Sequence, residues 1–491
     1  MDQKLKNLQQ KYAVNLFDWV NFESINDSKV LVFGDVDENF IFPIASRVGH
    51  LSIVLETNEI AEAVNYISLP QNVSVYKDLI NDDANVLREK LSGKTFDFVL
   101  IPSMSTIIEG FLGKTIDEII NEIADKWTSR KGKIYLAFDN KYSFDTIGGV
   151  KVDDDIVTFS YDDIKSFKEN YLKKYKSARV NVYYPMPEYR FPLRIYSDKY
   201  LPKLEDESAM TRNLIAIDKF KDYCNSYILS VELDKDKSKD EYETIYVKYN
   251  VNRTKEYALT TRIEENEKKE RQVVKKAKYK ESNNQIDTMV SNVDIITSKL
   301  VEILKPKSYI KAEQSKDGKA YAIYPYVDGE MLTDVIFDRI KKGDDEKEVI
   351  TEYMYKLIGK FNGIIQNYNL DCTFQNAMVK DGKIYVIDSE WVYRDTTEVD
   401  FLRYRILKYF WKSCRQYLTY ASFKDLLREF GIGYLDAERY EEAENEFQSK
   451  VHENINNLDI NQYEELKPVI TFRFLNSPFF IFSVPLLKNI S

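Results

Sequence analysis

The chain has 491 residues, 44% of them hydrophobic, so it can bury a large core and is long enough for more than one domain. Its net charge of −10 argues against a general nucleic-acid binder, because such proteins need clustered positive charge to displace counterions. Three cysteines and two histidines are too few for a disulfide framework or a zinc site, and they fit a reducing cytoplasm.

Strand-like and helix-like patterns alternate from about residue 29 to about residue 140, which predicts an α/β domain with a doubly wound parallel sheet. The strands are predicted at residues 30–35, 51–56, 73–78, 96–102 and 132–140. Helices are predicted between them, notably at residues 60–66, 84–91 and 115–127.

Two residues of this segment suggest a nucleotide-type cofactor. The first predicted strand ends near Gly34, and the second ends at Glu56. This pattern resembles the class I S-adenosylmethionine methyltransferase fold, and the resemblance implies that Gly34 and Glu56 belong to the cofactor site. However, Val36 stands where a second glycine would let the backbone approach the cofactor, and Asp37 adds negative charge nearby. The sequence therefore predicts a degenerate methyltransferase-like domain in which S-adenosylmethionine binding is doubtful.

Residues 179–202 are rich in proline and tyrosine, with prolines at 185, 187, 192 and 202. Proline excludes a helix and favours an extended chain. We predict an ordered connector between residues 1–178, the methyltransferase-like domain, and residues 203–491, a second domain.

The beginning of the second domain contains a candidate lysine for binding phosphate. Residues 243–250 alternate like a half-buried strand and carry Lys248 at the position of the phosphate-pairing lysine of a kinase. The preceding segment, residues 220–233, is the candidate phosphate loop, with Asn225 and Ser226 in its turn. The basic run at residues 268–280 is predicted to be a solvated insert. Glu281 is the only evident acid that could pair with Lys248.

The next elements follow in the order expected for a kinase. Residues 320–336 contain an apolar strand, a turn and a helix start, which is typical of the hinge between two lobes. Apolar residues at helical spacing predict a helix at residues 350–366. These elements divide the second domain into lobes at about residues 203–327 and 328–491.

The segment 370–391 contains the candidate catalytic residues. Asp371 is followed five positions later by Asn376, and Asp388 closes the β-rich run KIYVID. Phosphoryl transfer needs hard oxygen ligands that hold Mg²⁺ against the nucleotide phosphates. Protein kinases and antibiotic kinases use this spacing, so Asp371 is predicted to be the base and Asn376 and Asp388 the Mg²⁺ ligands. The sequence thus predicts an α+β, two-lobed, kinase-like domain that uses ATP.

Neither end of the chain predicts a membrane anchor. The N-terminus lacks the features of a secretory signal, and the apolar tail at residues 469–487 is interrupted by Arg473, Asn476, Pro478 and Pro485. We expect a cytoplasmic protein with no transmembrane segment. Packing of the tail on the protein itself is the preferred interpretation, and contact with a membrane or a partner is the alternative.

The combination of both domains is similar to the bifunctional methyltransferase and kinase proteins of bacterial surface polysaccharide synthesis, such as the O-antigen chain terminators. The phrases AFDNKYSFDTIGG, YYPMPEYRFPLRIYSDKYLP and IDSEW look like those of the Gram-positive relatives. The resemblance implies an ATP- and Mg²⁺-dependent kinase that phosphorylates a sugar hydroxyl of a glycan or glycolipid. It also implies partners among polysaccharide glycosyltransferases at the inner membrane face, and no nucleic acid.

Two alternatives stay open at this point. The missing phosphate-loop glycines and the uncertain acidic partner of Lys248 also fit a pseudoenzyme that acts as a scaffold in polysaccharide assembly. A third interpretation keeps both the methyltransferase and the kinase activity.

Overall fold

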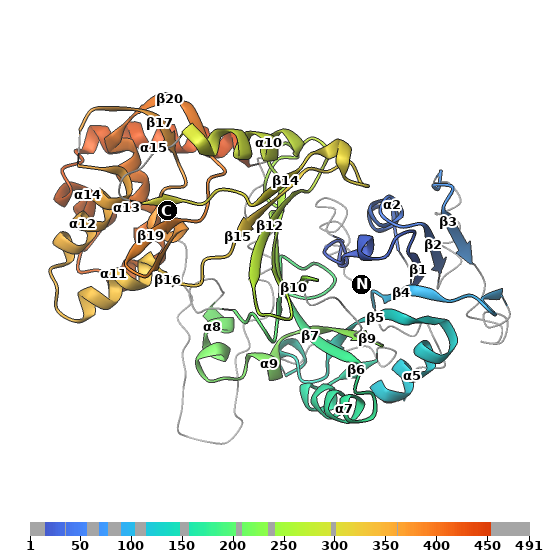
Figure 1. Ribbon diagram of the computed structural model, residues 1–491. Coiled ribbons are helices and arrows are strands. Elements are labelled where there is room, and N and C mark those ends of the chain that lie inside the picture. The colour runs from blue at the N-terminus through green and yellow to red at the C-terminus, as the bar shows by residue number, and fades with distance from the viewer. Residues whose placement is uncertain are drawn as a thin grey trace, which may run out of the picture.

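The computed structural model describes residues 15–34, 36–55, 68–76, 90–103, 114–147, 157–202, 209–233, 241–295, 301–360 and 362–452. The molecule is elongated (Figure 1). The blue and cyan elements of the first half lie at one end, the orange and red helices of the last third lie at the other, and the green and yellow strands connect them.

The predicted parallel sheet is present. Its strands lie side by side in the order β3-β2-β1-β4-β5. Their bounds are Val73–Tyr76 for β3, His50–Val54 for β2, Lys29–Phe33 for β1, Phe96–Ile101 for β4 and Thr128–Asn140 for β5. All five predicted strands are confirmed within a few residues at their ends.

Helices cover both faces of this sheet, as the doubly wound pattern predicts. Leu31 and Phe33 of β1 pack into one core, together with helices α5 (Ile116–Trp127) and α7 (Tyr161–Lys174). Val30 and Val32 point to the opposite face, into a core that includes helix α2 (Glu38–Ala45). This alternation is the period of two that a strand imposes on its side chains. The predicted helix at residues 115–127 is therefore confirmed, whereas those at 60–66 and 84–91 lie outside the described residues.

The sheet continues past the predicted end of the first domain. Strand β9 (Ser226–Glu232) pairs antiparallel with β5, and β7 (Arg179–Met186) pairs antiparallel with β9. Strand β8 (Arg194–Ser197) follows beside β7. The predicted connector at residues 179–202 is thus extended, as its prolines require, but its strands belong to the sheet itself. Extended proline-containing segments are compatible with both arrangements, and only long-range pairing distinguishes them.

The next strands extend the same sheet in antiparallel order. Strand β10 (Glu243–Tyr249) pairs with β8, and it is followed by β11 (Leu259–Glu265), β12 (Arg271–Ala277), β15 (Tyr321–Pro325) and β14 (Ser308–Ile310). Fourteen strands of the described residues form this one sheet. Helix α10 (Asn283–Asn292) packs against β12 and β15. The pairing of β8 with β10 therefore joins the two halves of the molecule through backbone hydrogen bonds.

The last third is a helical lobe with two small sheets. Strands β13 (Glu302–Ile303), β19 (Lys383–Val386), β18 (Ala377–Lys380) and β16 (Glu330–Met331) form one, and β17 (Ile364–Asn369) and β20 (Val392–Glu398) form the other. The helices are α11 (Leu332–Lys341), α12 (Glu346–Ile358), α13 (Val399–Cys414), α14 (Phe423–Glu429) and α15 (Tyr434–Val451). The strand, turn and helix predicted at residues 320–336 are confirmed by β15 and α11.

The helix predicted at residues 350–366 is shorter than expected. Helix α12 begins at Glu346 and ends at Ile358, where Gly359 follows with φ 88°. Residues 364–369 form β17 instead, because Ile364 and Ile365 pair with strand β20. Apolar spacing alone did not distinguish the end of the helix from the start of the strand.

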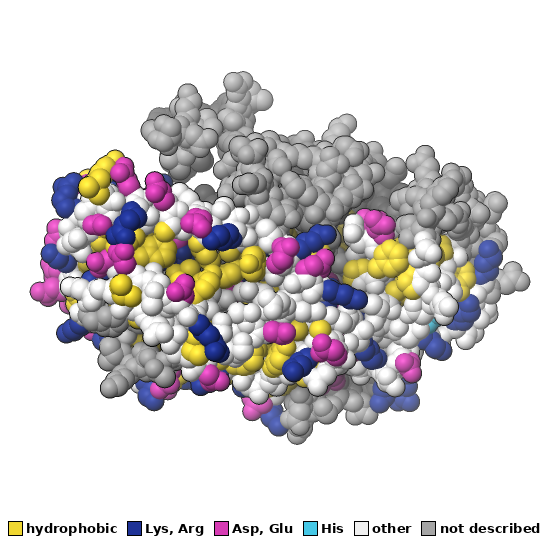
Figure 2. All heavy atoms as spheres, turned by 90° about the horizontal axis from the view of Figure 1, so that it is seen from above, with side chains coloured by type: hydrophobic (Ala, Val, Ile, Leu, Met, Phe, Trp, Pro, Cys, Tyr) yellow, Lys and Arg dark blue, Asp and Glu magenta, His cyan; other side chains and the backbone are white. Residues whose placement is uncertain are grey.

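The remaining described elements are short. They are the helices α6 (Phe144–Ile147), α8 (Ala209–Ala216) and α9 (Phe220–Tyr223), the strand β6 (Thr158–Phe159), and the 3-10 helices η1 (Phe22–Ser24), η4 (Val293–Ile295), η5 (Ala312–Gln314), η6 (Phe374–Asn376) and η7 (Arg415–Tyr417). Figure 2 shows basic and acidic side chains interspersed over the described part of one face. Among the described helices, none combines the length and the apolar composition needed to cross a membrane. The apolar tail at 469–487 lies outside these residues.

Candidate functional site

The three residues predicted to handle the proton and the metal lie close together. Asn376 and Asp388 flank the hairpin of β18 and β19, in which Ala377 pairs with Val386. The Asn376 side-chain nitrogen donates a 3.0 Å hydrogen bond to the backbone carbonyl of Asp371. The backbone carbonyl of Asn376 also accepts from the Ile387 N–H, next to Asp388. The short hairpin thus brings together residues that are 17 positions apart in the sequence.

Asp371 is held in one orientation by backbone groups. Its Oδ2 accepts hydrogen bonds from the N–H of Glu390 at 2.7 Å and of Trp391 at 3.0 Å. Among the described residues its other oxygen, Oδ1, has no hydrogen-bond donor, and Asp371 lines a pocket. A carboxylate that lines a pocket, with one oxygen fixed and the other without a donor, is suited to accept a proton from a bound hydroxyl group.

The lysine at this cluster is Lys275 and not the predicted Lys248. Lys275 lies on β12, and its Nζ is 2.6 Å from Asp388 Oδ1 and 2.8 Å from Glu390 Oε1. The Lys275 side chain is only 8% exposed. Lys248 lies on β10, two strands away, and its side chain is exposed to solvent. The structure therefore does not bring Lys248 to this cluster, because the strand that faces the second lobe is β12.

The cluster also contains three residues that the sequence analysis did not predict: Arg253, Gln285 and Glu390. Glu390 is buried and pairs with both Lys275 and Arg253. Arg253 comes from the loop between β10 and β11 and stacks over the Trp391 ring, 5.7 Å from its centroid. Gln285 of α10 donates a 2.9 Å hydrogen bond to the Glu390 carbonyl. Glu281 lies before α10 and is exposed, so helix α10 contributes an amide to this cluster and not an acid.

Burial and mutual repulsion set the protonation of the acids. Burial, Asp388 and Glu390 together raise the pKa of Asp371 to about 7. Burial also raises the pKa of Asp388, with Glu390 as the next cause. For Glu390 burial acts in the same direction, but Arg253 and Lys275 outweigh it and hold its pKa well below the usual range. An acid with a raised pKa that lines a pocket, as Asp371 does, is typical of catalytic sites, although structural ion pairs produce such shifts too.

The residues present fit an Mg²⁺ site in their chemistry. Asp388 supplies a carboxylate, and the Asn376 side-chain oxygen has no donor among the described residues. The Lys275 ammonium now neutralises Asp388, so it would have to share that carboxylate with an ion. No group of three or more His, Cys, Asp or Glu side chains in the described ranges forms a metal site by itself. Mg²⁺ usually takes only one or two protein carboxylates together with substrate phosphates, so a small protein ligand set is expected.

The predicted phosphate loop belongs elsewhere in the structure. The Asn225 carbonyl accepts from the Asn140 N–H, and the Asn225 amide donates to the Pro187 carbonyl. Ser226 begins β9, and its hydroxyl accepts from the Tyr189 N–H. Both residues hold strands of the first sheet together, and the structure does not bring them to the cluster at Asp371. The loop beside the cluster is the one between β10 and β11, residues 250–258, which carries Arg253.

The predicted cofactor residues of the first half are only partly described. Gly34 follows β1 with φ 129°, a conformation that favours glycine, and its N–H donates to the Val54 carbonyl. The N-cap of helix α2 is Asp37, whose side chain accepts from the Phe40 N–H. Glu56 lies outside the described residues. Gly34 is thus at the carboxyl edge of the sheet, where ligands bind in open α/β folds.

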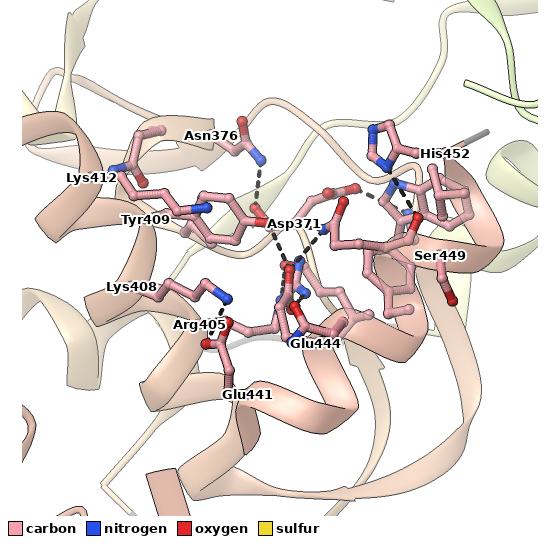
Figure 3. Close-up of a pocket in the computed structure, with 18 of the residues that line it drawn as sticks. Asp371, Asn376, Arg405, Lys408, Tyr409, Lys412, Glu441, Glu444, Ser449 and His452 are labelled. Atoms are coloured by element: carbon pink, nitrogen blue, oxygen red, sulfur yellow. Dashed lines mark hydrogen bonds and ion pairs between the residues drawn. The ribbon is translucent and has the colours of Figure 1, made fainter. Parts of the chain in front are cut away.

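A pocket of about 810 Å³ opens on one side of Asp371. Figure 3 shows Asp371 between residues of α13, namely Lys408, Tyr409 and Lys412, and the residues Ser449 and His452 at the end of α15. Asp371 and Asn376 line the pocket, whereas Lys275 and Asp388 do not. The cluster therefore has two sides: the Lys275 and Asp388 side toward the sheet, and the pocket side between helices.

No family model matches the chain, and no curated protein matches it. Among solved structures, the plantazolicin methyltransferase BpumL in complex with SAH gives a TM-score of 0.29 at 10% identity, over 47% of this chain and 85% of its own. StiE O-MT residues 961–1257 give a TM-score of 0.25 at 15% identity, over 47% and 75%. Spermidine synthase in complex with AdoDATO gives a TM-score of 0.24 at 12% identity, over 48% of this chain and 60% of its own. The description of the first half as a methyltransferase-like α/β fold therefore rests on its own strand order.

Proposed function

We propose that the second half of the chain is an Mg²⁺- and ATP-dependent phosphotransferase that acts on a sugar hydroxyl. The observation that carries the proposal is the meeting of Lys275 from the sheet with Asp388 and Glu390 from the helical lobe, beside the oriented carboxylate of Asp371. A lysine, a metal-binding acid and a base in this relation are the parts that phosphoryl transfer requires.

The order of elements supports the same proposal. Strands β10, β11 and β12, helix α10 and strands β14 and β15 precede the helical lobe, in the order of the smaller lobe of a protein kinase. In that order the third strand carries the phosphate-binding lysine, which is Lys275 here. The loop 250–258 takes the place of the glycine-rich loop, with Arg253 as a cation near the phosphates.

Each residue receives a role in the proposed reaction. The acceptor oxygen forms a bond to the γ-phosphorus of ATP, and the bond from that phosphorus to the β–γ bridging oxygen breaks, so its electron pair leaves with ADP. Asp371 takes the hydroxyl proton through Oδ1. Asn376 and Asp388 would hold Mg²⁺, which neutralises phosphate charge when bound. Lys275 would contact the phosphates after sharing Asp388 with the metal.

A thermal shift assay tests the proposal. ATP with Mg²⁺ should raise the unfolding midpoint of the wild-type protein, because a ligand at 100 times its Kd stabilises by about 2.7 kcal/mol. EDTA should remove the effect, and Asp388→Ala should not show it. Asp395→Ala is the matched control, since Asp395 is exposed on β20 and bonds its own neighbour Thr396. Absence of any shift in the wild type would favour the pseudoenzyme scaffold.

A second proposal concerns the first half: S-adenosylmethionine binds at the carboxyl edge of the parallel sheet. Support comes from the strand order and from Gly34 after β1, whose positive φ favours glycine at the edge where ligands bind in open α/β folds. Calorimetric titration with S-adenosylmethionine tests it, and Gly34→Val should abolish the heat. The absence of heat in the wild type would leave this half with a structural role.

A further inference from the structure

The pocket beside Asp371 is built mainly from two helices that face each other. Arg405, Lys408, Tyr409 and Lys412 recur at helical spacing on α13, and Glu441, Glu444 and Gln448 do so on α15. Such spacing places each set on one face of its helix. The pocket therefore has a basic wall and an acidic wall, with Asp371 between them (Figure 3).

Most charges of these walls neutralise one another. Arg405 pairs with Glu444, two side chains that are 4% and 1% exposed. Lys408 pairs with Glu441 at 2.8 Å. Arg253, which also lines the pocket, pairs with Glu390 behind it.

Two charged side chains of the lining remain without an ion pair among the described residues: Asp371 and Lys412. Lys412 is one helical turn beyond Lys408 on α13, and its Nζ lies 5.5 Å from the centre of the Tyr409 ring. The covered part of its side chain and the nearby Lys408 ammonium lower its pKa. An anion bound at Lys412 would relieve that repulsion.

The rest of the lining suits a sugar. Trp391, Tyr409 and Phe447 supply aromatic surface, and Trp391 and Phe447 are in edge-to-face contact at 5.2 Å. Asn445 and Gln448 add amide groups that can bond hydroxyls. A volume of about 810 Å³ exceeds the need of one sugar ring, so a ring with a charged substituent can be accommodated.

We propose that this pocket binds the acceptor as a sugar unit that carries an anionic group, with Lys412 as the residue that selects the anion. The acceptor hydroxyl lies at Asp371 Oδ1, the aromatic side chains cover the ring, and the carboxylate or phosphate group bonds the Lys412 ammonium. The substrate class rests on the proposed phosphotransfer at Asp371. Binding of the anionic sugar does not need the nucleotide, so the sugar-binding proposal and the phosphotransfer proposal can be refuted separately.

The test is calorimetric titration of the full chain without nucleotide, with galactose against galacturonate and glucose against glucose 6-phosphate. At least one anionic sugar should bind about 10- to 100-fold more tightly than its neutral partner, the effect of one charge-assisted hydrogen bond. The carboxylate and phosphate pairs show which anion is accepted. Lys412→Gln should abolish the preference, Lys412→Arg should keep most of it, and Lys450→Gln, in an exposed pair with Glu446, should not change it.

Turnover provides the second measurement. With the preferred sugar and Mg²⁺–ATP, Lys412→Gln should raise the acceptor KM at least about tenfold and leave the KM for ATP unchanged. Equal binding of neutral and anionic sugars, no binding of either anionic sugar, or a preference that survives Lys412→Gln would overturn the inference. Selective anion binding without ATP turnover would support the anionic-sugar pocket and contradict the proposed phosphotransferase activity. ATP binding without anion preference would support the nucleotide site and contradict the anionic-sugar pocket.

Discussion

Replacing Lys275 by methionine should destabilise the protein far more than the same change at Lys248. Lys275 Nζ is within 2.8 Å of both Asp388 and Glu390, and its side chain is 8% exposed. Removing one partner of a buried ion pair costs about 3–5 kcal/mol, because it leaves the other charge uncompensated. We expect the lower end, about 3 kcal/mol, because Glu390 keeps Arg253 and Asp388 is 28% exposed and can be hydrated.

The assay is thermal unfolding followed by near-ultraviolet circular dichroism, without ligands. For a unit of 150–250 residues, about 3 kcal/mol corresponds to a midpoint about 6–12 °C lower. Lys248→Met changes an exposed side chain and should cost no more than about 1 kcal/mol, the most that contacts of an exposed charge usually contribute. Equal losses in the two variants, or a larger loss for Lys248→Met, would refute the assignment of Lys275 to the buried cluster.

Three further predictions follow from the same contacts. Asp371→Asn should lower phosphotransfer turnover by about 10²- to 10⁴-fold while ATP affinity stays within twofold to threefold of wild type, and unchanged turnover would exclude Asp371 as the base. Burial and the neighbouring acids raise the pKa of Asp371 to about 7, so protonation of Asp371 stabilises the folded state. This stabilisation is complete below about pH 4 and is lost as the pH rises through 7. In denaturant titrations without Mg²⁺, the wild type should therefore lose more stability than Asp371→Asn between about pH 5 and 8. Arg405→Ala, which breaks the buried pair with Glu444 and the hydrogen bond to the Leu370 carbonyl, should cost about 3–5 kcal/mol, against less than about 1 kcal/mol for Lys450→Ala; similar values for both would contradict the role of Arg405 in holding the loop before Asp371.

The parts of the site that are close in sequence could be predicted. Asp371, Asn376 and Asp388 are joined by one hairpin, so their spacing alone brings them together. The five parallel strands could also be predicted from the sequence, because each is an apolar run between turn residues.

The partners from the sheet could not be predicted in the same way. Lys275 and Lys276 are adjacent on β12, and a strand sends such neighbours to opposite faces, so one pairs with Asp388 and the other with Asp317. In the sequence both lie in a basic run that is typical of a solvated segment. Val274 and Ala277 flank these lysines without a clear alternation, and only the pairing of β12 with β11 and β15 fixes which face meets the second lobe.

The same limit explains the misplaced phosphate loop. Residues 226–232 are fully buried between β5 and β7, and this depends on pairings across almost 100 residues. Once β9 is assigned to the first sheet, β10 is the first strand of the second half, and the loop beside the cluster is 250–258, which carries Arg253. Counting β9 with the second domain thus placed the expected lysine on β10, at Lys248, two strands away from Lys275 on β12.

Titration calorimetry with ATP and Mg²⁺ on wild type, Lys275→Met and Lys248→Met, at a temperature where all three are folded, tests the central claim most directly. We predict saturable, Mg²⁺-dependent heat for wild type and Lys248→Met with the same Kd, and a Kd at least about tenfold weaker for Lys275→Met, since a charge-assisted contact to phosphate is lost. Unchanged binding in Lys275→Met, or no heat with the wild-type protein, would contradict a nucleotide site formed by Lys275, Asp388 and Asp371.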